Sequence, residues 1–266
     1  AGSPAEGAPS PLNDAPSLLA RFRMSALRLS LNASLIPRGP AALADLNSTY
    51  WGVLSEALLG LEHNATGQTV DWLLQRYGGG AFGEEPGEPP DLASTYRAFR
   101  VLEVLNATNR VDNSSLTSFV LSCYNASEGS FSLEPGGAPS LEAAYYALYL
   151  LNATGSLSSV DLDLVARWIL LHNSSDWGFA WEVGGEPCTP ATYFAVKALL
   201  LVNATSPVSG WPHEETAKWL NSTRPSKDAG FYGYYNASVR LTFDLLSTRM
   251  AVEALALLGL ANDPAY

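Results

Sequence analysis

Histidine, glutamate and glycine residues form the two patterns in this sequence that come nearest to catalytic or cofactor-binding motifs. The segment His213-Glu214-Glu215-Thr216-Ala217 begins like the zinc-binding His-Glu-X-X-His helix, but alanine stands where the second histidine ligand is needed. Residues 78–83 fit Gly-X-Gly-X-X-Gly, which in dinucleotide-binding proteins follows a strand and opens a helix. Here an amphipathic helical pattern precedes the glycines, and two glutamates follow them that would repel a pyrophosphate. We therefore expect neither zinc nor a dinucleotide at these positions.

The other histidines and the two cysteines do not form a ligand set either. His63 and His172 each stand beside an Asn-X-Ser/Thr triplet at the end of a predicted helix, and we interpret them as surface groups. Cys123 closes one predicted helix and Cys188 opens another, so both are expected near one rim of the molecule. In an exported protein they either form a disulfide or remain two small buried thiols. The sequence predicts no metal, no cofactor and no catalytic residue, and a non-catalytic protein is favoured over an enzyme.

Asparagine carries the most specific compositional signal. Eleven of the fourteen asparagines begin an Asn-X-Ser/Thr triplet, the acceptor for N-glycosylation. Serine and threonine make up roughly a sixth of the chain, so chance would place about two asparagines in such triplets. The sequence therefore predicts an exported glycoprotein, extracellular or at the cell surface. The predicted sites are Asn32, Asn47, Asn64, Asn106, Asn113, Asn125, Asn152, Asn173, Asn203, Asn221 and Asn236.

Composition sets the domain organisation and excludes some partners. The chain has 266 residues, of which 47% are hydrophobic, so one sizeable domain over residues 17–266 is expected. Residues 1–16 are rich in alanine, glycine, proline and serine and read as an extended arm. The formal net charge of −11 gives no electrostatic footprint for nucleic acid. No apolar run reaches the roughly 18–20 residues of a transmembrane helix.

A repeat positions these residues. Asp45-Leu46-Asn47-Ser48-Thr49 resembles Asp91-Leu92-Ala93-Ser94-Thr95, and related openings recur at 137, 188 and 244. An Asp or Ser in these openings can cap the apolar helix that follows, and Pro139 and Pro190 suit its first turn. Amphipathic helices alternate with these apolar ones. Self-similarity at this period indicates a helical array or ring of five helical hairpins, with apolar helices inside and amphipathic helices outside. A helix predicted at residues 17–31 would supply the fifth outer helix and close the ring.

The best-preserved unit also carries a resemblance to a known family. The sequence Trp72-Leu73-Leu74-Gln75, then Gly80-Ala81-Phe82-Gly83, and then Asp91-Leu92 with Thr95-Tyr96 resembles the repeat of prenyltransferase β-subunits and squalene cyclases. Later copies keep Gly129-Ser130-Phe131, Trp177-Gly178-Phe179 and Gly230-Phe231, so the resemblance covers most of residues 41–260. It implies an all-α, α/α-toroid fold.

The resemblance does not extend to the catalytic residues of these enzymes. The zinc site of protein prenyltransferases needs an aspartate two places before a cysteine, where this chain has Leu121 and Glu186. The Asp-X-Asp-Asp acid motif of squalene cyclases is nearest to Asp161-Leu162-Asp163-Leu164, which lacks the last aspartate. We interpret these two acids as groups at a helix start, where negative charge is favourable.

Aromatic residues are expected to line the toroid lumen. In the resembling enzymes such a lining holds an isoprenoid chain, whereas with five hairpins the lumen should be narrow and filled by its own side chains. The predicted lining residues are Tyr96, Tyr145, Tyr146, Tyr193, Trp177 and Trp181.

These observations predict a non-catalytic, heavily N-glycosylated extracellular structural protein that assembles with copies of itself into a filament, sheath or surface layer. Residues 1–16 are the predicted contact with the neighbouring copy. Two alternatives remain: a secreted module that binds a small apolar, isoprenoid-like ligand, and a toroid enzyme of the cyclase, transferase or lyase kind.

Overall fold

The computed structural model describes residues 44–203, 208, 210–224, 230–232, 235–236, 239–240 and 245–259. The chain forms two compact units, residues 1–64 and 65–266, and each is described by itself. The boundary between the units falls within the single domain predicted from the sequence. The predicted arm, the predicted helix at 17–31 and Asn32 lie outside the described residues.

The described part of the first unit is built around one helix, α2 (Leu46–Leu58). Asp45 caps it, because its Oδ1 accepts a hydrogen bond of 2.7 Å from the backbone N–H of Ser48. That bond stabilises the carboxylate and lowers the pKa of Asp45. After the helix, His63 Nδ1 lies 2.6 Å from Glu56 Oε2, and this contact holds the following segment against α2.

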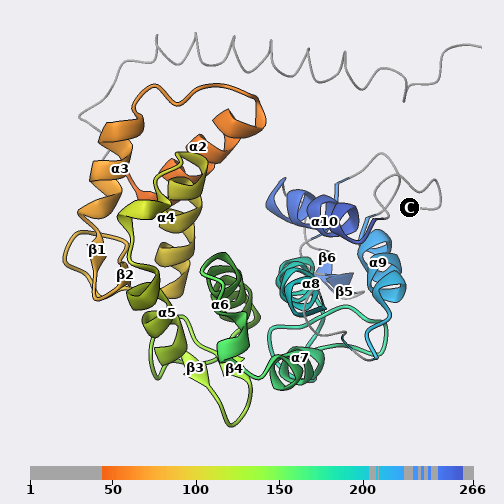
Figure 1. Ribbon diagram of the computed structural model, residues 1–266. Coiled ribbons are helices and arrows are strands. Elements are labelled where there is room, and N and C mark those ends of the chain that lie inside the picture. Colours follow the sequence, from red (N-terminus) through yellow and green to blue (C-terminus); the bar gives the residue numbers. More distant parts are fainter. Residues whose placement is uncertain are drawn as a thin grey trace, which may run out of the picture. The chain divides into compact units, whose positions relative to one another are not determined.

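The second unit alternates helices with short hairpins (Figure 1). Its inner helices are α4 (Leu92–Val104), α6 (Leu141–Ala153), α8 (Thr189–Asn203) and α10 (Leu245–Leu257), and adjacent members of this series pack together in that order. The outer helices, one before each inner helix, are α3 (Thr66–Leu74), α5 (Asn113–Ser122), α7 (Leu162–Leu170) and α9 (His213–Ser222). Three two-residue strand pairs are described, β1 (Tyr77–Gly78) with β2 (Ala81–Phe82), β3 (Tyr124–Asn125) with β4 (Ser130–Phe131), and β5 (Tyr235–Asn236) with β6 (Val239–Arg240). Single turns of 3₁₀-helix follow α4 and α6, at Thr108–Arg110 and Leu157–Ser159.

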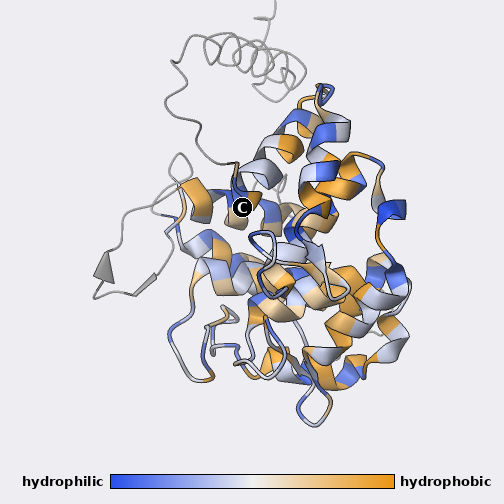
Figure 2. Cartoon of the chain, turned by 90° about the vertical axis from the view of Figure 1, so that its left-hand side faces the viewer, coloured by the Kyte–Doolittle hydropathy of each residue, from blue (hydrophilic) through white to orange (hydrophobic). Residues whose placement is uncertain are grey.

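The alternation predicted from the sequence is clearest for α6, α7 and α8, whereas the outer helix α5 has little amphipathic character. Helix α5 packs on α6, α7 packs on α8, and α9 packs on both α8 and α10. Helices α6 and α8 are buried along most of their length, whereas α7 has one clearly apolar side and one polar side. Figure 2 shows hydrophobic residues along the helices and many hydrophilic residues at helix ends and in the connections. No helix in the described part of the chain has both the length and the hydropathy of a membrane span.

A phenylalanine in each turn joins an outer helix to the next inner helix. Phe82, Phe131 and Phe179 are fully buried, and the carbonyl of each accepts a bond from the residue that precedes the next inner helix. In three of the four Gly-Phe turns the phenylalanine N–H donates to a threonine hydroxyl on that helix, at 2.9–3.0 Å; the pairs are Phe82 with Thr95, Phe179 with Thr192 and Phe231 with Thr248. The threonines of the Asp-Leu-X-Ser-Thr pattern therefore fix the turn to the helix.

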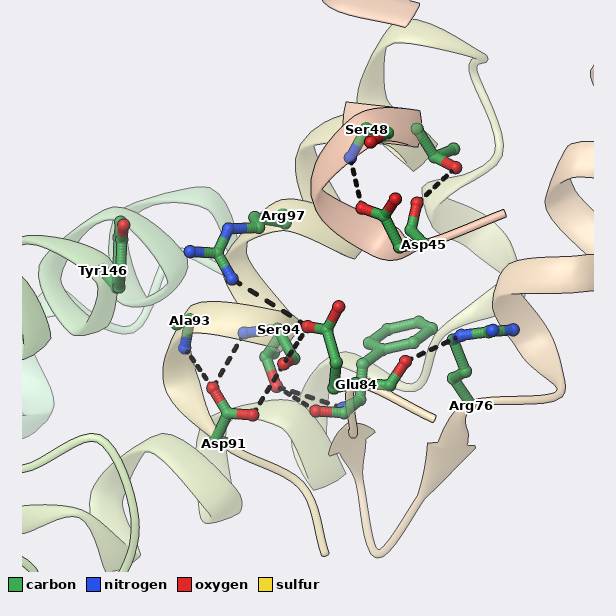
Figure 3. A network of polar contacts seen from close by, with 12 residues as sticks. Asp45, Ser48, Arg76, Glu84, Asp91, Ala93, Ser94, Arg97 and Tyr146 are labelled. Carbon is green, nitrogen blue, oxygen red and sulfur yellow. Dashed lines mark hydrogen bonds and ion pairs between the residues drawn. The ribbon is translucent and has the colours of Figure 1, made fainter. Parts of the chain in front are cut away.

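A buried arginine fixes the loop that follows the first turn (Figure 3). Arg76 donates from Nε to the Glu84 carbonyl at 2.9 Å. It also donates from Nη2 to Glu85 Oε2 at 2.9 Å. Its guanidinium also lies 3.6 Å from the centre of the Trp72 ring. Glu84 in turn accepts a bond from the Ser94 hydroxyl, so the two glutamates of this loop are held by arginine and serine groups. The sequence pattern contained no indication of this role for Arg76.

His172 is buried and not a surface group, which corrects the sequence-based interpretation. Only 6% of the residue is exposed, its ring lies 4.5 Å from the Trp168 ring, and Nδ1 donates to the Trp168 carbonyl at 3.0 Å. His172 lies at the end of its helix, and its carbonyl accepts a hydrogen bond from the N–H of Ala180 in the returning segment of the hairpin. The equivalent residues in the other hairpins, with the same backbone bond, are Arg76, Cys123 and Thr223. A helix end that packs against its own hairpin buries whichever side chain is there.

Acidification is expected to destabilise the protein through His172. Burial lowers the pKa of His172, so the native state holds the ring neutral while the unfolded chain protonates below about pH 6.5. The stability contributed by the neutral ring is therefore present above pH 6.5 and is lost as the pH falls. The urea midpoint of the wild type should drop between pH 7.5 and pH 5.5 by more than that of His172→Gln. His213→Gln, which changes an exposed histidine, should keep the wild-type dependence, and equal drops in all three proteins would contradict the assignment.

Candidate functional site on the inner face

The inner helices bring a cluster of aromatic rings together. Tyr96 of α4 stacks on Tyr146 of α6, with ring centres 4.4 Å apart, and its hydroxyl lies 2.9 Å from that of Tyr145. Phe194 of α8 contacts the tyrosines of α6 and Trp181 at 5.8–6.1 Å. The four tyrosines of the prediction and Phe194 are each at most 7% exposed. This part of the inner face is filled by the protein's own side chains.

Charged residues complete this face in two groups. Between α4 and α6, the Tyr149 hydroxyl donates to Glu103 Oε2 at 2.6 Å, and Arg100 bonds to both of these residues. Between α8 and α10, Lys197 Nζ donates to Glu253 Oε1 at 2.6 Å. The other oxygen of Glu253 accepts bonds from Arg249 at 2.7 Å and from the Tyr193 hydroxyl at 3.0 Å. Each group joins two adjacent inner helices through one shared carboxylate.

Burial controls the ionisation of these groups. Loss of solvent lowers the pKa of Lys197, and Glu253 opposes that shift. Burial also raises the pKa values of Tyr149 and Tyr193, so both phenols stay protonated and donate to their carboxylates at physiological pH. The Lys197 ammonium lies 4.7 Å and 5.0 Å from the rings of Tyr145 and Tyr193, which adds cation–π attraction. The site therefore combines neutral phenols with ion pairs between basic side chains and Glu103 or Glu253.

The repeat explains how this site forms. Most of its members occupy the fifth and ninth residues of the four inner helices, which face the same side because they are four residues apart. Tyr146 and Phe194 are sixth residues, and Glu103 is the twelfth residue of α4. The fifth residues are Tyr96, Tyr145, Tyr193 and Arg249, and the ninth residues are Arg100, Tyr149, Lys197 and Glu253. The sequence analysis found the tyrosines at the fifth position but missed the ninth. Single charges inside the apolar runs 193–202 and 249–260 were the signal that could have found it.

The other predicted residues lie in different places. Trp181 contacts the aromatic cluster through Phe194, whereas Trp177 lies in the turn between α7 and α8 and shares no ring contact with the cluster among the described residues. Cys123 and Cys188 are both buried thiols and are not joined by a disulfide. They belong to different turns, at the end of α5 and the start of α8. Burial raises the pKa of Cys123 to about 11, so its thiol stays protonated.

The asparagines of the glycosylation triplets lie mainly at the surface. Seven of those whose side chains are described are exposed, and these are Asn47, Asn64, Asn106, Asn113, Asn125, Asn152 and Asn203. Asn173 and Asn221 are half-buried, and the side chain of Asn236 lies outside the described residues. At Asn125, Oδ1 accepts bonds from both the N–H and the hydroxyl of Ser127, the hydroxyl residue of its triplet. The triplets are therefore mostly located where an attached sugar would meet solvent.

Two further features define what the described residues offer chemically. No group of three or more histidine, cysteine, aspartate or glutamate side chains gathers in a metal-binding arrangement among them. A cavity of about 380 Å³ lies away from the inner cluster, between the first hairpin and α5. It is lined by Gly79, Gly80, Phe119 and four serines, so it carries no charged side chain.

The comparisons with known proteins agree with this architecture. The model of the prenyltransferase alpha-alpha toroid domain matches residues 40–239, and the chain belongs to that family. The structure resembles Candida albicans protein geranylgeranyltransferase-I complexed with GGPP, with a TM-score of 0.66 over 91% of this chain and 77% of that chain. The two sequences are 16% identical, so this likeness shows the fold alone. No curated protein matches the sequence significantly. The predicted α/α-toroid fold and prenyltransferase-like repeat are confirmed.

Proposed function

We propose that this toroid is an exported, N-glycosylated structural protein that is not an enzyme and that assembles with copies of itself into a filament, sheath or surface layer. The observation that carries the proposal is the placement of eleven of fourteen asparagines in glycosylation triplets. The exposure of seven of these asparagines supports it, because an attached sugar needs access to the side-chain amide. Glycans on several parts of the surface suit a protein that is permanently exposed to the environment.

The inner face supports a non-catalytic role. The Candida albicans transferase is complexed with GGPP, whereas in this chain the tyrosines and ion pairs of the inner helices bond to each other. A ligand that displaced Tyr96 would break the contact of its hydroxyl with that of Tyr145, and one that displaced Glu253 would break the bond to Lys197. Either change leaves buried polar groups without their present partners, which is unfavourable. An inner face whose polar groups satisfy one another is what a structural toroid needs.

The assembly part of the proposal rests on the sequence of residues 1–16. An extended arm rich in proline and alanine can lie along a neighbouring copy at low entropic cost, because proline restricts the unbound chain. Deleting residues 1–16 should leave the thermal unfolding midpoint unchanged but abolish filaments, sheaths or layers in electron micrographs. Assemblies that persist without these residues would remove the arm from the proposal.

Glycopeptide mapping of protein isolated from its own cells tests the glycosylation. Peptides with Asn106, Asn113, Asn125, Asn152 and Asn203 should carry added saccharide mass, because these asparagines are exposed within triplets. Asn109 is the matched control, since it is exposed three residues after Asn106 but lacks the triplet. Saccharide on the triplets and none on Asn109 supports the proposal. Unmodified peptides throughout would overturn it.

A second candidate function is the binding of a small apolar ligand, which the aromatic character of the same face favours. Native mass spectrometry of protein from its own cells separates the two candidates. A stoichiometric apolar adduct that is lost when Phe194 is replaced by aspartate would favour ligand binding. A chain that carries only saccharide mass would favour the structural role.

A further inference from the structure

Trp177 has a backbone conformation that the corresponding turns give to glycine. The turn is closed by a bond of 2.7 Å from the Ser174 N–H to the Gly178 carbonyl, and the Trp177 N–H donates to the Ser174 carbonyl at 3.1 Å. Trp177 has a φ of 65°, and the residues at its place in the two earlier turns are Gly80, with φ 91°, and Gly129, with φ 74°. A left-handed backbone is unfavourable for a residue with a Cβ atom, and least favourable for a bulky one.

The packing of this turn does not require an indole at position 177. The adjacent Gly178 makes the close approach to the next outer helix, because a Cβ atom there would lie 2.2 Å from Trp219 Cε2. Trp177 itself is half-buried, and no aromatic ring contact of its indole is found among the described residues. Because Gly178 makes the close approach to the helix, the left-handed conformation of Trp177 needs another explanation, which is a reason to look for a ligand of its side chain.

A glycosylation triplet begins the same turn. Asn173-Ser174-Ser175 leads into it, and Asn173 pairs with Phe179 across it in an antiparallel bridge. The bond from the Ser174 N–H to the Gly178 carbonyl closes this turn, with Asn173 one residue before the bond and Trp177 one residue inside it. The two residues therefore belong to the same short hairpin. An indole presents a flat apolar face with negative charge density, which attracts the weakly positive C–H groups on the face of a sugar ring.

We propose that the indole of Trp177 is the stacking platform for the first sugars of an N-linked glycan on Asn173. The inference rests on the glycosylation in the proposed function and assigns one glycan a defined position on the protein. The contact offsets the strain of the left-handed tryptophan only when the sugar is attached. The turn is therefore tuned for the glycosylated chain, and the unmodified chain would be more stable with glycine at this position.

A double-mutant cycle in glycosylated protein from the native host tests the inference. Ser175→Ala removes the triplet while it keeps Asn173, and Trp177→Gly removes the platform. In the Ser175→Ala background, Trp177→Gly should raise the urea midpoint, because strain is relieved. In the glycosylated background it should lower the midpoint, and Trp177→Phe should retain most of the wild-type value. A control with Thr108→Ala, which removes the Asn106 triplet instead, should leave the effect of Trp177→Gly as it is in the wild type.

The outcomes separate this inference from the proposed function. If Trp177→Gly shifts the urea midpoint equally with and without the Asn173 glycan, the proposed stacking of the glycan on Trp177 is wrong. Mass spectrometry that finds saccharide at other triplets but none at Asn173 would also overturn it, and would leave the proposed function intact. Absence of saccharide from every triplet would overturn both.

Discussion

Replacing Phe131 by alanine is expected to lower the free energy of unfolding by about 3–5 kcal/mol. Phe131 is fully buried, packs against Tyr124 with ring centres 4.8 Å apart, and joins the turn after α5 to the start of α6. The substitution removes the whole ring from a site where backbone bonds hold the surrounding turn. The cavity therefore cannot collapse freely, and the loss should reach the upper part of this range. Urea unfolding followed by circular dichroism measures it.

Leu171→Ala is the matched control, because Leu171 follows α7 and is 60% exposed. Its effect should stay within about 0.5 kcal/mol. A loss below about 1 kcal/mol for Phe131→Ala would show that the turn is not a structural joint of the repeat. A similar loss for Phe82→Ala or Phe179→Ala would extend the conclusion to the other turns, since both rings are also fully buried.

Replacing Glu253 by glutamine should lower the free energy of unfolding by about 2–3 kcal/mol. This carboxylate neutralises Lys197 at 2.6 Å and Arg249 at 2.7 Å, so its loss leaves two cations side by side on the inner face. The Lys197 side chain is only 15% exposed, which makes an unpaired charge there costly. The expected loss of unfolding free energy is smaller than for a fully buried ion pair, because 35% of the Glu253 side chain is exposed and water screens part of the interaction.

Glu215→Gln is the control for Glu253→Gln. Glu215 also lies 2.6 Å from a lysine, but both side chains are about half exposed, so its loss should cost less than about 0.5 kcal/mol. The double variant Lys197→Met with Glu253→Gln should be less destabilised than Glu253→Gln alone, because it leaves fewer unpaired charges. Equal effects of Glu253→Gln and Glu215→Gln would contradict the assigned role of the inner-face cluster.

The repeat made the helices and their starts predictable from the sequence. Asp45, Asp91 and Ser140 cap helices as expected, because a short polar side chain before an apolar run has the free N–H groups of the first turn as partners. The alternation of apolar and amphipathic helices likewise follows from which side each helix buries. Both are local properties; the caps were predicted correctly, and the alternation holds for α6, α7 and α8 but not for α5.

Contacts between repeats were harder to predict. Lys197 and Glu253 are 56 residues apart, and only the superposition of inner helices shows that each occupies a ninth position. Arg76 and His172 are buried because a helix end packs on its own hairpin, a feature that hydropathy does not reveal. The backbone of Trp177 could not be anticipated either, since its sequence position gives no sign that the residue adopts the conformation of a glycine.

The mass of the intact protein from its own cells tests the central claim most directly. The account predicts a distribution of masses, spaced by whole saccharide units, that collapses to one lower mass after chemical removal of the sugars. A single mass that the same treatment leaves unchanged would contradict the account.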